Sequence, residues 1–97
     1  MPTAAAPSDE GRLAADLRAT IRDYPDWPRP GVLFRDLMPV FADVALMRRT
    51  VRALAQSRAS LQPTHVVAIE SRGFILGAPV ALELGLPLVP VRKLGKL

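Results

Sequence analysis

The ninety-seven-residue sequence has no cysteine, one histidine and few aromatic residues. Without cysteine the chain can form neither a disulfide framework nor a catalytic thiolate, and one histidine argues against a zinc site. The sequence also lacks a glycine-rich P-loop, a nucleophile elbow and a His-based triad. No apolar run approaches membrane-spanning length, and the N-terminus lacks the pattern of a secretory signal. We therefore expect a cytoplasmic protein without a membrane partner.

The remaining composition is typical of one small globular domain. Hydrophobic residues make up 49% of the chain and charged residues 23%, which excludes an intrinsically disordered protein. Because aromatic residues are only 5% of the chain, the core must consist mainly of Leu, Val and Ala. Thirteen basic and nine acidic residues give a net charge of +4. This balance favours a phosphate-bearing partner but does not distinguish a nucleotide from a nucleic acid.

The most informative stretch runs from His65 to Gly85. A short apolar run rich in β-branched residues, ending at Ile69, predicts a strand buried on both faces. The polar turn Glu70-Ser71-Arg72 follows, and an Ala- and Leu-rich stretch predicts a helix from about Gly73, kinked at Pro79, that ends at Gly85. The helix N-terminus and the Arg72 guanidinium could bind an anion. The alternative is an ordinary turn in which Glu70 and Arg72 pair in solvent.

A second strand is predicted at 86–91, directly before Arg92 and Lys93. Strand, helix and strand within about thirty residues form a βαβ unit with parallel strands and a right-handed crossover. Ligands of such sheets bind beyond the carboxyl ends of the strands. Both polar segments, 70–72 and 92–93, are expected at that edge. Two basic clusters at one edge favour a polyanion as ligand.

The N-terminal part predicts a tail and one helix. Residues 1–7 are expected to be a disordered tail, and residues 8–97 the N-terminal portion of a domain. Ser8 can cap a helix that ends before Pro25, with Arg22 near its negative end. The apolar stripe of this helix comprises Leu13, Leu17 and Ile21.

The segment 24–31 holds three prolines and must be extended. Residues 32–37 continue as a short extended piece, in which Phe34 is either a core residue or a ring-stacking residue.

A second helix is predicted from a cap at Asp43 to about Ser60. Its expected buried face comprises Val44, Met47, Val51, Leu54 and Ala55. Arginines lie mainly off that face, but no aromatic residue is interleaved to stack bases, so we expect no nucleic-acid partner.

Four blocks in order carry a resemblance to a known family. They are Ile21–Pro28, Pro30–Asp36, Glu70–Pro79, and Val89–Lys93 with Gly95–Leu97. From about residue 12 to its end, the chain resembles the N-terminal half of adenine phosphoribosyltransferases. The resemblance implies an α/β fold of type I phosphoribosyltransferase: a hood segment, two helices, and a βαβ unit of an incomplete parallel sheet.

The resemblance also implies an activity and its site residues. Members of the family join adenine to 5-phosphoribosyl 1-diphosphate with Mg²⁺, giving AMP and pyrophosphate in purine salvage, and we expect a homodimer. The backbone of Leu33 and Arg35 would contact the adenine edge, and Phe34 would lie on its ring. The pyrophosphate would be held by Glu70, Ser71, Arg72, Arg92, Lys93 and Lys96, partly across the dimer interface.

The chain departs from the family pattern after Leu97. The family's loop with a catalytic acid, its paired aspartates and its Thr-Gly-Gly turn for the ribose 5-phosphate are not among these residues. We therefore expect a truncated form, with no catalytic residue and no metal ligand of its own, that lacks phosphoribosyl transfer by itself. The alternative is a non-catalytic binding or interaction module on the same fold, such as a regulator or a dimerising fragment.

Overall fold

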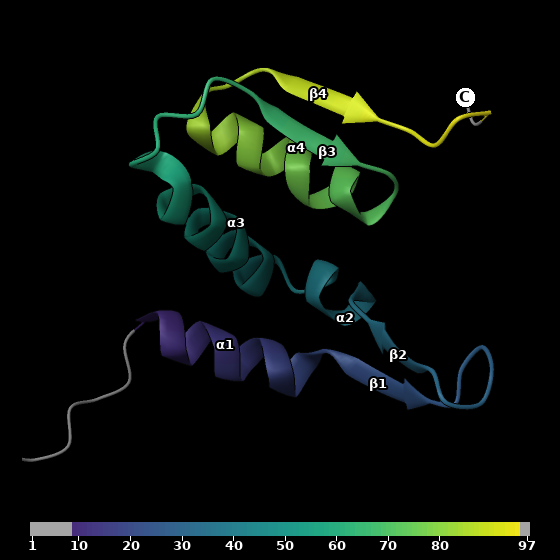
Figure 1. Cartoon of the computed structure of the whole chain (residues 1–97). Helices are drawn as coiled ribbons and strands as arrows, with labels where there is room; N and C mark the ends of the chain where they lie inside the picture. The colour runs from purple at the N-terminus through teal and green to yellow at the C-terminus, as the bar shows by residue number, and fades with distance from the viewer. Residues whose placement is uncertain (1–8, 96–97) are drawn as a thin grey trace, which may run out of the picture. The chain divides into compact units, whose positions relative to one another are not determined.

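The computed structural model describes residues 9–95, which form two compact units divided between Arg49 and Thr50. The predicted tail 1–7, the Ser8 cap and the pyrophosphate-site residue Lys96 lie outside the described residues. Each unit combines helix with strand, and the α/β prediction is confirmed (Figure 1). No helix within residues 9–95 is long and apolar enough to cross a membrane.

The first unit begins with helix α1, Asp9–Thr20, which leads into strand β1, Arg22–Pro25. Acidic residues in the first turn and Arg18 in the last complement the helix dipole. Directly after the helix, Ile21 N donates a hydrogen bond to Leu17 O at 2.8 Å. The predicted helix, which ends before Pro25 and has Arg22 near its end, is too long, because residues 22–25 pair with β2 as a strand.

Strand β2, Leu33–Asp36, pairs antiparallel with β1 in the register Arg22↔Asp36 to Pro25↔Leu33. The predicted extended piece at 32–37 is thereby confirmed. This sheet has two strands, so both are edge strands, which is where a proline such as Pro25 is tolerated. Helix α2, Met38–Phe41, follows and was not predicted. The Asp36 carboxylate accepts a hydrogen bond from Met38 N at 2.9 Å, and Pro39 fits the first helical turn.

Helix α3, Val44–Ala59, begins at the predicted cap. Asp43 Oδ1 accepts a hydrogen bond from Leu46 N at 3.0 Å, which confirms that prediction. The predicted buried face is only partly right. Val51 and Ala55 are buried, but Val44 and Leu54 are exposed, and Leu46 is buried instead. A 3.6-residue period allows neighbouring stripes, and the structure buries the stripe rotated toward Leu46.

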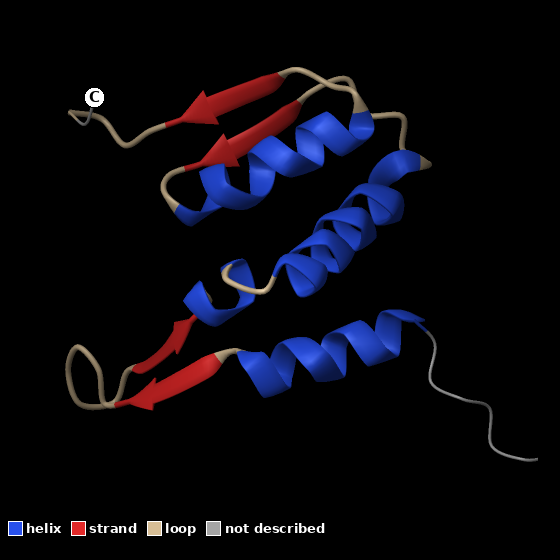
Figure 2. Ribbon diagram, turned by 180° about the vertical axis from the view of Figure 1, so that it is seen from behind, coloured by secondary structure: helices blue, strands red, loops and turns tan. Residues whose placement is uncertain are grey.

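The second unit contains strand β3, Val66–Ile69, helix α4, Arg72–Leu84, and strand β4, Leu88–Val91. The strands pair parallel in the register Val66↔Leu88 to Ile69↔Val91, as the βαβ prediction required. Helix α4 continues through Pro79 and lies along the β3–β4 sheet (Figure 2). Gly85 ends the helix in the left-handed conformation, with φ 68°, as predicted.

The β3–β4 sheet is covered on one face within this unit. Ala68 of β3 and Ala81 of α4 are both 3% exposed. Val67 and Ile69, whose side chains alternate with that of Ala68, are 60% and 63% exposed. The prediction that β3 is buried on both faces is therefore wrong for the described residues, because α4 covers only the Ala68 face.

Candidate functional site

The carboxyl ends of β3 and β4 bring the two predicted polar segments together. We call this region the carboxyl edge, defined by Glu70, Ser71, Arg72, Arg92 and Lys93. Glu70 N donates a hydrogen bond to Val91 O at 3.0 Å, which extends the strand pairing by one residue. The Glu70 Oε1 atom accepts a hydrogen bond from Lys93 N. The predicted convergence of the segments 70–72 and 92–93 is therefore present in the structure.

Helix α4 begins at this edge. Phe74 N donates to Ser71 O at 3.1 Å, and the Ser71 side chain makes no capping bond. The peptide bond between Glu70 and Ser71 is cis. The Arg92 guanidinium lies over the Phe74 ring, with its central carbon 5.2 Å from the ring centroid. A guanidinium at this distance gains a cation–π attraction and a defined location. The edge thus combines three basic side chains with a helix N-terminus, a combination that can bind a polyanion.

The predicted base site lies in the other unit, on β2. Leu33, Phe34 and Arg35 are consecutive residues of this strand. Phe34 stands opposite Tyr24 of β1, and the two ring centroids are 6.5 Å apart with an interplanar angle of 50°. Arg35 Nε lies 3.7 Å from Asp23 Oδ1 on β1. The Tyr24 ring therefore supports Phe34 from the neighbouring strand, a contact that the sequence interpretation did not include.

The loop between β1 and β2 is held by hydrogen bonds within the loop. Asp26 Oδ1 accepts a hydrogen bond from Gly31 N at 2.9 Å, and Trp27 N donates to Val32 O at 3.1 Å. These bonds close the proline-rich loop and fix the start of β2. Trp27 itself is 58% exposed.

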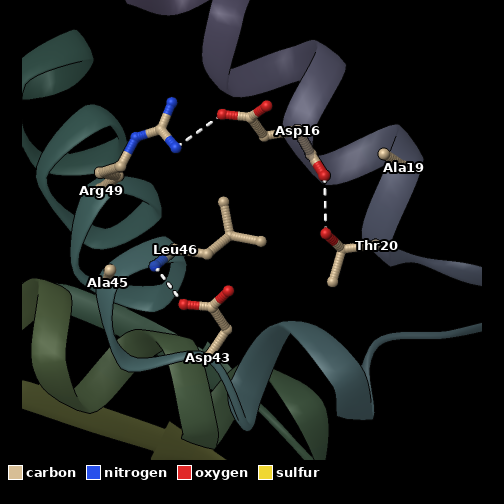
Figure 3. Close-up of a pocket in the computed structure, with 7 residues that line it drawn as sticks. All are labelled: Asp16, Ala19, Thr20, Asp43, Ala45, Leu46 and Arg49. Atoms are coloured by element: carbon tan, nitrogen blue, oxygen red, sulfur yellow. Dashed lines mark hydrogen bonds and ion pairs between the residues drawn. The ribbon is translucent and has the colours of Figure 1, made fainter.

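A hollow that the sequence did not indicate lies in the first unit (Figure 3). It is lined by Asp16, Ala19, Thr20, Asp43, Ala45, Leu46 and Arg49. Arg49 Nη1 donates to Asp16 Oδ2 at 2.7 Å, and Thr20 Oγ1 donates to Asp16 O at 2.8 Å (Figure 3). Since Asp43 caps α3, these polar groups serve as structural partners of one another, and we do not assign the hollow a ligand.

A magnesium ion, which the resemblance implies, would need oxygen ligands. Mg²⁺ in nucleotide enzymes is bound by one or two carboxylates together with substrate phosphates. No group of three or more His, Asp or Glu residues in the part of the chain that the structure describes could hold a metal ion. The described residues of the carboxyl edge therefore do not form a metal site by themselves.

The fold has known counterparts. A crystal structure of adenine phosphoribosyltransferase from Saccharomyces cerevisiae, complexed with adenine and an imino-altritol bisphosphate, matches 89% of the chain with a TM-score of 0.81 and 37% identity, over 53% of that chain. An adenine phosphoribosyl transferase from Trypanosoma brucei, in complex with AMP, pyrophosphate and ribose-5-phosphate, matches 93% with a TM-score of 0.78 and 26% identity, over 41% of that chain. The fold is that of the N-terminal part of a type I phosphoribosyltransferase.

Comparison with curated sequences identifies relatives with the same name. Adenine phosphoribosyltransferase from Carboxydothermus hydrogenoformans is 57% identical over 82 residues, which is 84% of this chain and 48% of the relative. The search against family models found no match. In sequence and in fold, the chain is similar to adenine phosphoribosyltransferases. It spans about half the length of the curated relatives it matches.

Proposed function

We propose that this chain supplies the adenine site and one pyrophosphate-binding edge for phosphoribosyl transfer in purine salvage. In that reaction a ring nitrogen of adenine forms a bond to C1 of the ribose of 5-phosphoribosyl 1-diphosphate. The bond from C1 to the diphosphate oxygen breaks, and the diphosphate leaves with the electron pair. The nitrogen loses its proton, and the products are AMP and pyrophosphate. The observation that carries the proposal is the convergence of basic groups at the carboxyl edge.

The carboxyl edge is suited to a departing diphosphate. Arg72 and Arg92 carry planar forks of donors that match phosphate oxygens, and Lys93 adds a further positive charge. Preformed donors aimed at developing negative charge lower the barrier because they need no reorganisation during the reaction. Mg²⁺, when bound with the diphosphate, would neutralise part of the same charge. The neighbour complexes with pyrophosphate and AMP support this ligand class.

The adenine site is proposed on β2. Phe34 offers a flat, half-buried ring for a purine to stack on. Leu33 and Arg35 are two residues apart, so their backbone groups point to the same side of the strand. In a two-stranded sheet β2 pairs on one side only, which leaves polar backbone groups available to a base edge. The neighbour structure that contains adenine supports this choice of base.

Titration calorimetry with inorganic pyrophosphate tests the proposal. Arg72→Ala should weaken binding by about 1–3 kcal/mol, the scale of a hydrogen bond to a charged group. Arg48→Ala is the matched control, because it removes the same charge from an exposed position of α3 outside the carboxyl edge. Unchanged affinity in Arg72→Ala, or an equal loss in Arg48→Ala, would show that binding reflects net charge and not this edge.

A further inference from the structure

We infer that Glu70 is a positioning residue that fixes the Arg92–Lys93 segment, and that its carboxylate does not contact the pyrophosphate. The inference rests on the proposed function, since it concerns the same edge. It assigns to Glu70 a role different from that of a direct pyrophosphate ligand, which is the role that the resemblance to the family implies. Its basis is the pair of hydrogen bonds that Glu70 makes across the sheet.

These two bonds flank Arg92. Glu70 N donates to Val91 O at 3.0 Å, on the N-terminal side of Arg92. Glu70 Oε1 accepts from Lys93 N, on the C-terminal side. One residue thus restrains the backbone before and after Arg92, just past the last paired residues of the parallel strands, Ile69 and Val91.

The restraint determines where the Arg92 side chain can reach. With its backbone fixed on both sides, Arg92 places its guanidinium over Phe74, 5.2 Å from the ring centroid. Phe74 belongs to the first turn of α4, two residues after Arg72. The guanidinium of Arg92 is therefore held beside the helix N-terminus that would receive the anion. Loosening the segment 92–93 would cost binding free energy, because the segment would have to be ordered again on association.

The charges at the carboxyl edge also favour a positioning role for Glu70. A carboxylate beside a diphosphate repels it, and a carboxylate with no counter-group near a ligand of like charge is unfavourable. Glu70 instead directs an oxygen at a backbone amide, and the carboxyl edge also contains three basic residues, Arg72, Arg92 and Lys93. The inferred role requires only a side chain long enough to place an acceptor oxygen at the Lys93 amide. A glutamine provides that acceptor without the charge.

Two variants separate the two roles. Glu70→Gln keeps an acceptor oxygen at the same position, whereas Glu70→Ala removes it. Glu83→Ala is the control for loss of one negative charge, since Glu83 is exposed on α4. Each protein is titrated with inorganic pyrophosphate, with and without Mg²⁺. The hydrogen exchange of the Lys93 amide is measured in parallel by NMR without any ligand, and circular dichroism checks that each variant is folded.

If Glu70 positions the segment, Glu70→Ala should bind pyrophosphate about tenfold more weakly, the scale of one lost hydrogen bond to a charged group in a partly exposed site. Glu70→Gln should stay within about twofold of the wild-type chain, and its Lys93 amide should remain protected. Glu83→Ala should match the wild type in both measurements. The Lys93 amide of Glu70→Ala should exchange faster than that of the wild type.

Three results would overturn the inference. Equal losses in Glu70→Gln and Glu70→Ala, especially if confined to solutions with Mg²⁺, would make the charge itself the functional feature. Unchanged Lys93 exchange in Glu70→Ala would show that the bond does not order the segment. Unchanged pyrophosphate affinity in Glu70→Ala, alongside a loss in Arg72→Ala, would refute the role of Glu70 while leaving the proposed function intact. Unchanged pyrophosphate affinity in Arg72→Ala, alongside a loss in Glu70→Ala, would refute the proposed role of Arg72 and support that of Glu70.

Discussion

The contact between α4 and β3 at Gly77 gives a sharp test of the packing. A Cβ atom built on Gly77 would lie 2.6 Å from Ala68 Cβ, whereas carbon atoms in favourable contact are about 3.5–4.0 Å apart. Ala68 is 3% exposed and lies in the middle of β3, where it pairs with Pro90 of β4. The clash involves the Cβ atom, which no side-chain rotation can move. Gly77→Ala must therefore push the helix away from the sheet.

The expected cost follows from two opposing effects. Overpacking a well-fitted contact costs about 1–3 kcal/mol. Replacing glycine by alanine inside a helix returns up to about 1 kcal/mol. We expect Gly77→Ala to lower the free energy of unfolding by about 1–2 kcal/mol, because the first effect is larger. The measurement is urea denaturation followed by circular dichroism, with amide exchange in β3 and α4 to locate the change.

Two controls make this prediction refutable. A Cβ on Gly73, in the same helix, would find its nearest atom at 3.8 Å, an ordinary contact, so Gly73→Ala should be neutral or stabilising. In an Ala68→Gly background the opposing methyl group is absent, and Gly77→Ala should lose most of its cost there. A Gly77→Ala protein as stable as the wild type, or an equal loss in Gly73→Ala, would show that helix and sheet are not in close contact at this point.

Two further predictions concern the first unit. Phe34→Ala should weaken adenine binding and leave pyrophosphate binding unchanged in calorimetric titrations; comparable losses for both ligands would instead identify Phe34 as a core residue whose removal leaves a cavity. Asp43→Ala should lower the free energy of unfolding by about 0.5–2 kcal/mol because Leu46 N loses its capping acceptor, whereas Asp43→Ser should retain most of the stability. In urea denaturation, equal stability of the two Asp43 variants would contradict the capping role.

Signals confined to a few neighbouring residues predicted several of the helices and strands well. Asp43 before an apolar periodic stretch located the start of α3, and Gly85 located the end of α4. The apolar runs on either side of α4 located two parallel strands. From these elements the geometry of parallel sheets placed the segments 70–72 and 92–93 at one edge. Each of these features depends on local backbone preference or on a general rule of chain topology.

Features that depend on a partner distant in the sequence were not predictable in the same way. Helix periodicity alone predicted too long a helix for α1. Arg22 instead belongs to β1, because it pairs with Asp36, a residue of β2 fourteen positions later. The apolar run of β3 indicated two buried faces, since Val67 and Ile69 are as apolar as Ala68. A run of apolar residues indicates which faces of a strand could be buried. Which faces are buried depends on the number of layers that pack on the sheet.

Glu70 shows most clearly why a site cannot be assigned from charge and spacing alone. In the sequence it stands beside Ser71 and Arg72, so it is naturally grouped with them as part of one anion-binding turn. Its side chain bonds to the backbone amide of Lys93, twenty-three residues away. Any residue except proline offers such an amide, so this partner has no side-chain signature. In the proposed pyrophosphate site this acceptor role would account for the negative charge, because the carboxylate would position the segment that carries Arg92 and Lys93.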